Sequence, residues 1–100
     1  AAAGSYFMNP AVPKAIQKMF ETEKSVAARE GRVPAGWLIE KAGMRGFSFG
    51  GAIASVQHPN YIVNQGGATA KDVLALAEKI KDAVRKSFGI ELHEEAAIFS

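Results

Sequence analysis

The feature that most constrains the fold is an amphipathic stretch at residues 70–87, because one of its faces must pack against an apolar surface. Its apolar stripe consists of Val73, Leu76, Ala77, Ile80, Ala83, Val84 and Phe88. Thr69 followed three residues later by Asp72 predicts a capped start, and Gly89 is placed to end a helix. We therefore predict a long helix from about Ala70 to Ser87 that packs one face on something flat.

A hairpin is the predicted partner of this helix. Residues 51–56 and 61–64 have the composition of two short strands, and the polar residues 57–60 between them predict a turn. Residues 43–51 contain four glycines, which favour positive φ angles or close backbone approach. We expect this glycine-rich segment to be a loop with at most a short strand.

The two ends of the chain add further strand candidates. Residues 5–8 are short and aromatic, and Asn9 and Pro10 stop them with a turn or helix-entry signal. Residues 90–93 and 96–99 predict a last strand that is broken in the middle. We expect these segments to extend the sheet.

Two shorter helices are predicted, at residues 13–22 and 35–43, with the polar residues 23–33 as loop or frayed helix. The residues expected to face the core are Ile16, Met19 and Phe20 in the first helix and Trp37, Leu38 and Ala42 in the second. The predicted fold is α+β, a two-layer single domain over residues 1–100. A small mixed or antiparallel sheet is packed by the long C-terminal helix and the shorter helices.

Composition excludes several classes of protein. The chain has 100 residues, of which 48% are hydrophobic and 22% charged, as in an ordinary soluble globule. It has no cysteine, so disulfide frameworks and thiolate metal sites are excluded, and His58 and His93 are too far apart in sequence to predict a zinc site. From this Cys and His content we predict no metal site. No segment has the length of a membrane span, so we also predict no membrane association and a cytoplasmic location.

Six polar residues are candidates for chemistry, but each has a plain structural explanation. A flexible terminus accounts for Ser5, a turn for Asn9 before Pro10, and ordinary solvation for a lone arginine, a turn histidine and two adjacent acids. The glycine-rich loop matches neither a P-loop nor a dinucleotide fingerprint. The candidates are Ser5, Asn9, Arg45, His58 and the pair Glu94 and Glu95.

A series of ordered segments nevertheless resembles one family closely. They are GSYFMNP at 4–10, PAGWLIEKAGMRG at 34–46, GGA at 50–52, QH at 57–58, YIVN at 61–64, GATAKDV at 67–73, FGIEL at 88–92 and EE at 94–95. The chain is similar to the C-terminal, substrate-binding domain of the UDP-N-acetylenolpyruvoylglucosamine reductases, the MurB family of bacterial peptidoglycan synthesis. The resemblance covers nearly the whole chain and is least constrained at residues 14–33.

The resemblance implies a role for each candidate. The family reduces the enolpyruvyl ether of a UDP-sugar to a lactyl ether with NADPH through a bound FAD. Ser5 matches the serine that protonates the intermediate, and Glu95 matches the carboxylate that helps to stabilise the enol, with Glu94 as its solvated neighbour. Asn9 matches the amide that contacts the diphosphate of the nucleotide. Arg45 is then expected to contact phosphate, and His58 to lie near the bound substrate.

The chain also departs from the family pattern. Met8 stands where many members carry a lysine, and Glu94 stands where many carry a proline. Residues Ala96 and Ala97 replace the Val-Arg that often follows the catalytic glutamate. The family holds FAD in N-terminal domains that these 100 residues do not contain. We therefore expect the isolated chain to be inactive, to bind neither FAD nor NADPH tightly, and to have the UDP-sugar and those flavin-binding domains as partners.

Two other functions are open at this point. A formal net charge of +2 with a pI of about 9.1 and a charged long helix are compatible with a small basic module that binds nucleic acid or an acidic protein. The charged residues of the helix lie mostly off its apolar stripe, so a solvated face explains them better and we expect no nucleic-acid partner. A purely structural domain, in which the glycines only shape turns, is the third interpretation.

Overall fold

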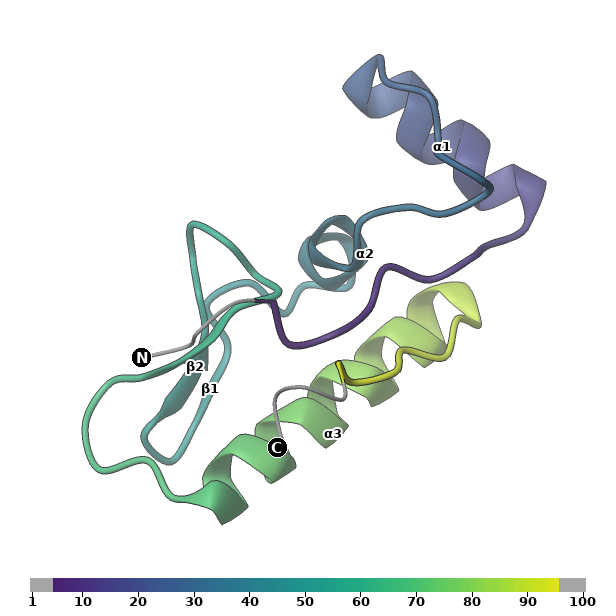
Figure 1. Ribbon diagram of the computed structural model, residues 1–100. Helices are drawn as coiled ribbons and strands as arrows, with labels where there is room; N and C mark the ends of the chain where they lie inside the picture. Colours follow the sequence, from purple (N-terminus) through teal and green to yellow (C-terminus); the bar gives the residue numbers. More distant parts are fainter. Residues whose placement is uncertain (1–4, 96–100) are drawn as a thin grey trace.

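The computed structural model describes residues 5–95, which contain three helices and one three-stranded sheet (Figure 1). The helices are α1 (Lys14–Lys24), α2 (Ala35–Lys41) and α3 (Ala70–Phe88), and the strands are β1 (Ser48–Phe49), β2 (Ala52–Ala54) and β3 (Ile62–Asn64). The predicted α+β class is confirmed, and the sheet is antiparallel throughout.

Helix α3 begins and ends as its sequence predicts. The Thr69 hydroxyl accepts a hydrogen bond from the Asp72 amide at 3.1 Å, and the Asp72 carboxylate accepts one from the Thr69 amide at 3.1 Å. This reciprocal pair satisfies two amides that have no partner inside the helix. Gly89 ends the helix with a φ of 70°, which costs glycine little. The apolar face is buried at Leu76, Ala77, Ile80 and Val84.

The hairpin of β2 and β3 is also confirmed, with shorter strands than predicted. Ile53 pairs with Val63 in the middle of an antiparallel ladder, and β1 pairs with the other edge of β2. Ala52 and Ala54 are fully buried on the face of the sheet that α3 covers. The small side chains on β2 let the long helix pack closely against the sheet.

The predicted terminal strands do not join this sheet. Instead Phe7 forms an isolated antiparallel bridge with Glu94, so the purple N-terminal segment and the yellow C-terminal segment run side by side in Figure 1. Residues 90–93 contain no strand, and the predicted strand residues 96–99 lie outside the described residues. The two segments pair only at the bridge because each is occupied elsewhere, by the Asn60 loop on one side and by α3 on the other.

Helix α1 is longer than predicted and includes Glu23 and Lys24, whereas residues 25–33 form the predicted loop. Ile16 and Phe20 are buried, but Met19 is 51% exposed and its predicted core position is wrong, because α1 contacts the rest of the molecule along a narrow face. Trp37 of α2 joins three helices. Its ring lies edge-on to Phe20 at 5.3 Å and near Phe88 of α3 at 6.0 Å.

Candidate functional site

The terminal pairing brings together two candidates from opposite ends of the sequence, Ser5 and Glu95. The Glu95 amide donates to the Tyr6 carbonyl at 2.9 Å, and the Met8 amide donates to the His93 carbonyl at 2.8 Å. In an antiparallel pair with this register, Glu95 lies opposite Tyr6, so Ser5 is one residue away from the partner of Glu95. Both residues are half-buried. A hydroxyl-bearing and a carboxylate-bearing residue therefore lie within one position of each other on paired segments.

Asn60 holds this segment from the opposite side. Its side-chain oxygen accepts from the Phe7 amide at 2.9 Å, and its side-chain nitrogen donates to the Phe7 carbonyl at 2.9 Å. Its backbone carbonyl accepts from the Tyr6 amide at 2.7 Å. Asn60 is 8% exposed. The sequence gives no signal for this role, because asparagine in a polar turn is ordinarily a turn former.

The loop that contains Asn60 also contains His58. The imidazole is exposed and packs against the Tyr61 ring at a centroid distance of 5.4 Å. The His58 amide donates to the Ser55 hydroxyl at 3.1 Å, which fixes the turn. The structure thus brings the predicted His58 to the edge of the molecule where Asn60 contacts the Ser5 segment.

Asn9 lies farther along the same segment, at the start of α2. Its side-chain oxygen accepts from the Ala35 amide at 2.9 Å and so satisfies a free amide of the helix. Its backbone carbonyl accepts from the Arg32 guanidinium at 2.8 Å. The amide nitrogen is then the part of the Asn9 side chain that is suited to donate to a ligand.

Two cavities, of about 570 Å³ and about 300 Å³, meet at Asn9 and Arg32, which line both. The exposed side chain of Met8 and the carboxylate-bearing Glu91 lie at the smaller cavity. Arg32 is therefore a cation beside Asn9, in a place where Met8 supplies no charge. Sequence reasoning missed Arg32 because it falls in an irregular loop with no motif around it.

Arg45, the arginine that the sequence singles out, lies elsewhere. It follows the C-terminal end of α2 and pairs with Glu40 at 4.0 Å. Asn9 caps the other end of α2, which has 7 residues and so spans about 10 Å. Arg45 and Asn9 are thus separated by the length of this helix.

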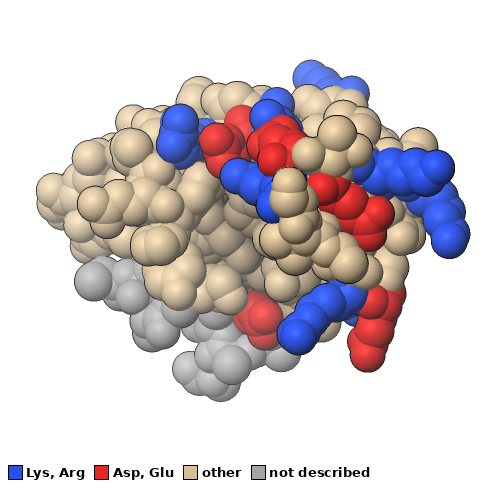
Figure 2. Space-filling view, turned by 90° about the horizontal axis from the view of Figure 1, so that it is seen from above, with Lys and Arg blue, Asp and Glu red and all other residues tan. Residues whose placement is uncertain are grey.

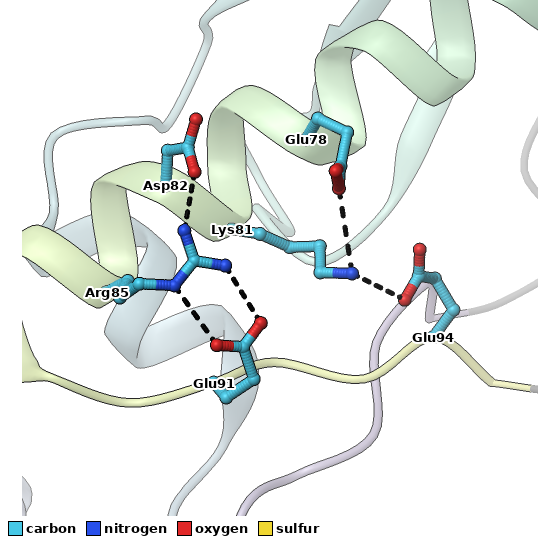
Figure 3. A network of polar contacts seen from close by, with 6 residues as sticks. All are labelled: Glu78, Lys81, Asp82, Arg85, Glu91 and Glu94. Carbon is cyan, nitrogen blue, oxygen red and sulfur yellow. Dashed lines mark hydrogen bonds and ion pairs between the residues drawn. The ribbon is translucent and has the colours of Figure 1, made fainter.

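Two groups of charged side chains join the C-terminal segment to α3 (Figure 3). Lys81 lies 3.2 Å from Glu94 and 3.6 Å from Glu78. Burial by itself lowers the pKa of Lys81, but the hydrogen bonds and attraction of the two acids outweigh it, and the pKa is raised. Arg85 bonds both carboxylate oxygens of Glu91, at 3.0 and 2.9 Å, and holds the pKa of Glu91 below its usual range.

The Tyr6 phenol, next to Ser5 in sequence, stays protonated at neutral pH. Burial raises its pKa first, and the negative charges of Glu94 and Glu78 raise it further. The ring is 4% exposed and lies edge-on to Phe7 at 4.9 Å. Tyr6 therefore contributes a neutral, ordered wall beside Ser5.

The glycine-rich loop does not fit a flavin. A phosphate cradle needs open space over the glycines, but here the Asp72 carboxylate lies against Gly50 and accepts from the Gly51 amide at 3.4 Å. Those bonds, first with the Thr69 backbone and then with Gly51, lower the pKa of Asp72, so the carboxylate is charged at neutral pH and would repel a diphosphate. Gly50 and Gly51 therefore do not form an open cradle for a flavin phosphate, although the space next to Gly43 is open.

Three further observations concern nucleic-acid binding, metal binding and membrane association. Figure 2 shows acidic and basic side chains interspersed on the face in view, without a continuous basic area. Within residues 5–95 no three His, Asp or Glu side chains gather as metal ligands. No helix in the same range combines the length and apolar character needed to cross a bilayer.

The comparisons with known proteins agree on one family. The family model of the C-terminal domain of UDP-N-acetylenolpyruvoylglucosamine reductase matches residues 1–99. The enzyme of that name from Heliobacterium modesticaldum is 44% identical over 96 residues, which are 96% of this chain and 24% of that protein. Its counterpart from Geobacter sulfurreducens is 58% identical over 66 residues, 65% of this chain and 22% of that protein.

A solved structure shares the fold as well as the sequence. The crystal structure of UDP-N-acetylenolpyruvylglucosamine reductase (MurB) from Thermus caldophilus aligns with a TM-score of 0.60 and 34% identity, over 94% of this chain and 26% of that chain. The chain spans about a quarter of the length of the relatives that it matches.

Proposed function

The chain belongs to the family of UDP-N-acetylenolpyruvoylglucosamine reductases, as their C-terminal domain, and on that premise we propose that it binds the enolpyruvyl UDP-sugar and protonates it during reduction. The observation that supports the proposal is the pairing of Phe7 with Glu94, in which the Glu95 amide bonds the carbonyl of Tyr6, the residue next to Ser5. The rest of the described chain supports the paired segments that carry Ser5 and Glu95.

Ser5 is the proposed proton donor. Reduction of the alkene adds a hydride to one carbon and leaves an enolate-like centre at the other, which must take a proton. A serine is a weak acid, so its hydroxyl must be held on that carbon and the resulting alkoxide must be stabilised or rapidly reprotonated. Glu95 acts at the enolpyruvyl end and helps to stabilise the enol. The neutral Tyr6 beside Ser5 adds no negative charge that would oppose this intermediate.

Asn9 and Arg32 are the proposed contacts for the diphosphate. The Asn9 amide nitrogen and the guanidinium of Arg32 lie together where the two cavities meet, and both groups donate hydrogen bonds to phosphate oxygens. Asn9 is four residues after Ser5, so an extended chain spans at most about 14 Å between them. A sugar ring that carries its reacting group on one side and its diphosphate on the other can bridge this separation. His58 remains a proposed contact near the sugar, and Arg45 a more distant phosphate contact.

FAD and NADPH belong to the remainder of the complete protein in this proposal. When bound there, they supply the hydride. The carboxylate of Asp72 supports this division, because its negative charge lies against Gly50 and Gly51 of the glycine-rich loop. The residues of this chain hold the substrate and supply the proton, and we expect the isolated chain to have no reductase activity.

The test is Ser5→Ala in the complete protein. We expect its rate of reduction of the enolpyruvyl UDP-sugar to fall by about 10²- to 10⁴-fold, the usual contribution of general acid catalysis, with little change in KM. Steady-state kinetics with NADPH consumption as the readout measures this. The matched control is Ser48→Ala on β1, an exposed serine outside the site, which should retain wild-type activity. A normal rate for Ser5→Ala would refute the assignment.

The basic binding module has no comparable support. Two of the five cations of α3 are paired with acids, Lys81 with Glu94 and Arg85 with Glu91. Paired cations release few counterions on binding phosphate, so their contribution to nucleic-acid affinity is small. We therefore retain the reductase proposal as the function of the chain.

A further inference from the structure

We propose that Asn60 is a positioning residue for catalysis, whose amide and backbone hold the Tyr6 and Phe7 backbone so that Ser5 faces the carbon to be protonated. The inference rests on the proposed function, because it needs Ser5 to be the proton donor. It assigns a role to the one buried polar side chain that the structure reports within residues 5–95.

Asn60 alone makes the kind of hydrogen bonds to this segment that a neighbouring β-strand would make. The Asn60 side chain both accepts from the Phe7 amide and donates to the Phe7 carbonyl, each at 2.9 Å. The backbone carbonyl of Asn60 adds a bond of 2.7 Å from the Tyr6 amide, whose nitrogen is covalently linked to Ser5. Three short bonds from one buried residue thus fix the three peptide groups that follow Ser5.

Asn60 also decides the position of the segment relative to Glu95. On its other side the segment is held by two bonds, from Glu95 to Tyr6 and from Met8 to His93, around an isolated bridge. An isolated bridge has no neighbouring ladder to fix its register. With Asn60 in place, a slip of one residue would break the bonds on both sides at once. Asn60 therefore keeps the serine and the glutamate in register.

Other side chains cannot replace this amide. Aspartate has nearly the same shape but cannot donate when ionised, and it would place a negative charge against the Phe7 carbonyl. Asn60→Asp is consequently a sharp probe, since it removes one donor and adds a repulsion without changing the volume.

The experiment uses Asn60→Asp in the complete protein. A displacement of about 1 Å from reactive geometry costs on the order of 10²-fold in rate, so we expect kcat to fall by about 10- to 100-fold with KM within about threefold of wild type. Because protonation becomes slow, the solvent deuterium isotope effect on kcat should rise. On a Ser5→Ala background the same substitution should cause no further loss, since groups that act as one unit are not additive.

The matched control is Asn64→Asp on β3. The Asn64 side-chain oxygen accepts from the Gly66 and Ala68 amides, which an aspartate oxygen also does, and the residue is exposed. We expect wild-type kcat and an unchanged isotope effect. If Asn60→Asp does not fold at the assay temperature, Asn60→Ser, which is neutral and smaller, replaces it with the same expected loss of kcat and rise in the isotope effect.

The two proposals fail in different ways. A normal kcat for Asn60→Asp or Asn60→Ser, with Ser5→Ala inactive, would overturn the role of Asn60 and leave the proposed function intact. The same holds if the Asn60 variant slows the Ser5→Ala enzyme further, since Asn60 would then act on something other than Ser5. If Ser5→Ala is fully active, the proposed function fails first and the role of Asn60 fails with it.

Discussion

Gly51 and Gly36 differ in the space that the surrounding atoms leave for a side chain. A Cβ on Gly51 would overlap the Gly66 carbonyl and the Ala68 backbone, in the loop that leads from β3 into α3. A Cβ on Gly36, within α2, would lie at an ordinary contact distance of 3.7 Å from Asn60. One glycine is therefore required by close backbone approach, whereas the other only weakens a helix.

We expect Gly51→Ala to lower the free energy of unfolding by about 1–3 kcal/mol, because the backbone atoms in its way cannot rotate aside. Gly36→Ala should raise the free energy of unfolding by about 0.5–1 kcal/mol, because alanine loses less entropy in a helix. Urea denaturation followed by circular dichroism measures both. If Gly51→Ala leaves the free energy of unfolding unchanged, the loop that contains Gly66 and Ala68 does not lie against Gly51.

At the residue scale, the candidates divide by whether a local signal marks them. Ser5, Asn9 and Glu95 stand in segments whose order the resemblance identifies, and their roles stay predictions until the variants are measured. Asn60 and Arg32 have no such signal, because a turn asparagine and a loop arginine are common on surfaces. Their importance comes from contacts with residues far away in sequence, such as Phe7 and Asn9.

At the element scale, the start of α3 also holds the sheet in place. Asp72 accepts from the Thr69 amide within the capping box and from the Gly51 amide between β1 and β2. The carboxylate therefore joins the first turn of α3 to the turn between β1 and β2. The favourable interaction of a negative charge with a helix N-terminus acts in the same direction.

This arrangement predicts a pH-dependent contribution to stability. The pKa of Asp72 is lowered from its ordinary value of 3.8 by its backbone hydrogen bonds. The unfolded chain then takes up the proton first, so the contribution is complete above the unfolded pKa and is lost as pH falls through the folded one. Wild type should be more stable than Asp72→Asn near neutral pH, and the difference should shrink below about pH 4.

The comparison isolates Asp72 because the asparagine does not titrate. Urea denaturation of both proteins from about pH 2 to pH 7 gives the difference in unfolding free energy at each pH. A difference that stays constant over this range would show that the charge of Asp72 contributes nothing to the folded state.

At the scale of the whole molecule, the C-terminal segment is held on α3 by two ion pairs of unequal burial. The side chains of Lys81 and Glu94 are 18% and 26% exposed, whereas those of Arg85 and Glu91 are 48% and 50% exposed. The first pair is adjacent to the bridge between Phe7 and Glu94, and so to the site. Its loss would loosen the segment that carries Glu95.

We expect a double-mutant cycle with Lys81→Met and Glu94→Gln to give a coupling free energy of about 1 kcal/mol, since neither side chain is fully solvated. A parallel cycle with Arg85→Met and Glu91→Gln serves as the exposed control. Raising the salt to about 1 M should weaken the exposed pair much more than the Lys81 pair, because salt screens exposed charges. Equal salt sensitivity would show that Lys81 is solvated.

The local signals predicted much of the fold. Helical spacing and caps act over a few residues, so α3 and its ends, the hairpin of β2 and β3, and the approximate positions of α1 and α2 follow from neighbouring side chains. The errors lie where a segment must choose a distant partner. Met19 is exposed because α1 contacts the rest of the molecule along a narrow face. The terminal segments pair with each other instead of with the sheet.

The sequence by itself determined the capped helix, the turns and the identity of the family, because each depends on residue types at fixed short spacings. Only the tertiary structure decided that the segments of Ser5 and Glu95 pair, that Asn60 is buried against Phe7, and that Arg32 lies beside Asn9. These contacts join residues that are far apart along the chain. Their formation depends on the packing of α2, α3 and the β2–β3 loop together, and no local pattern encodes it.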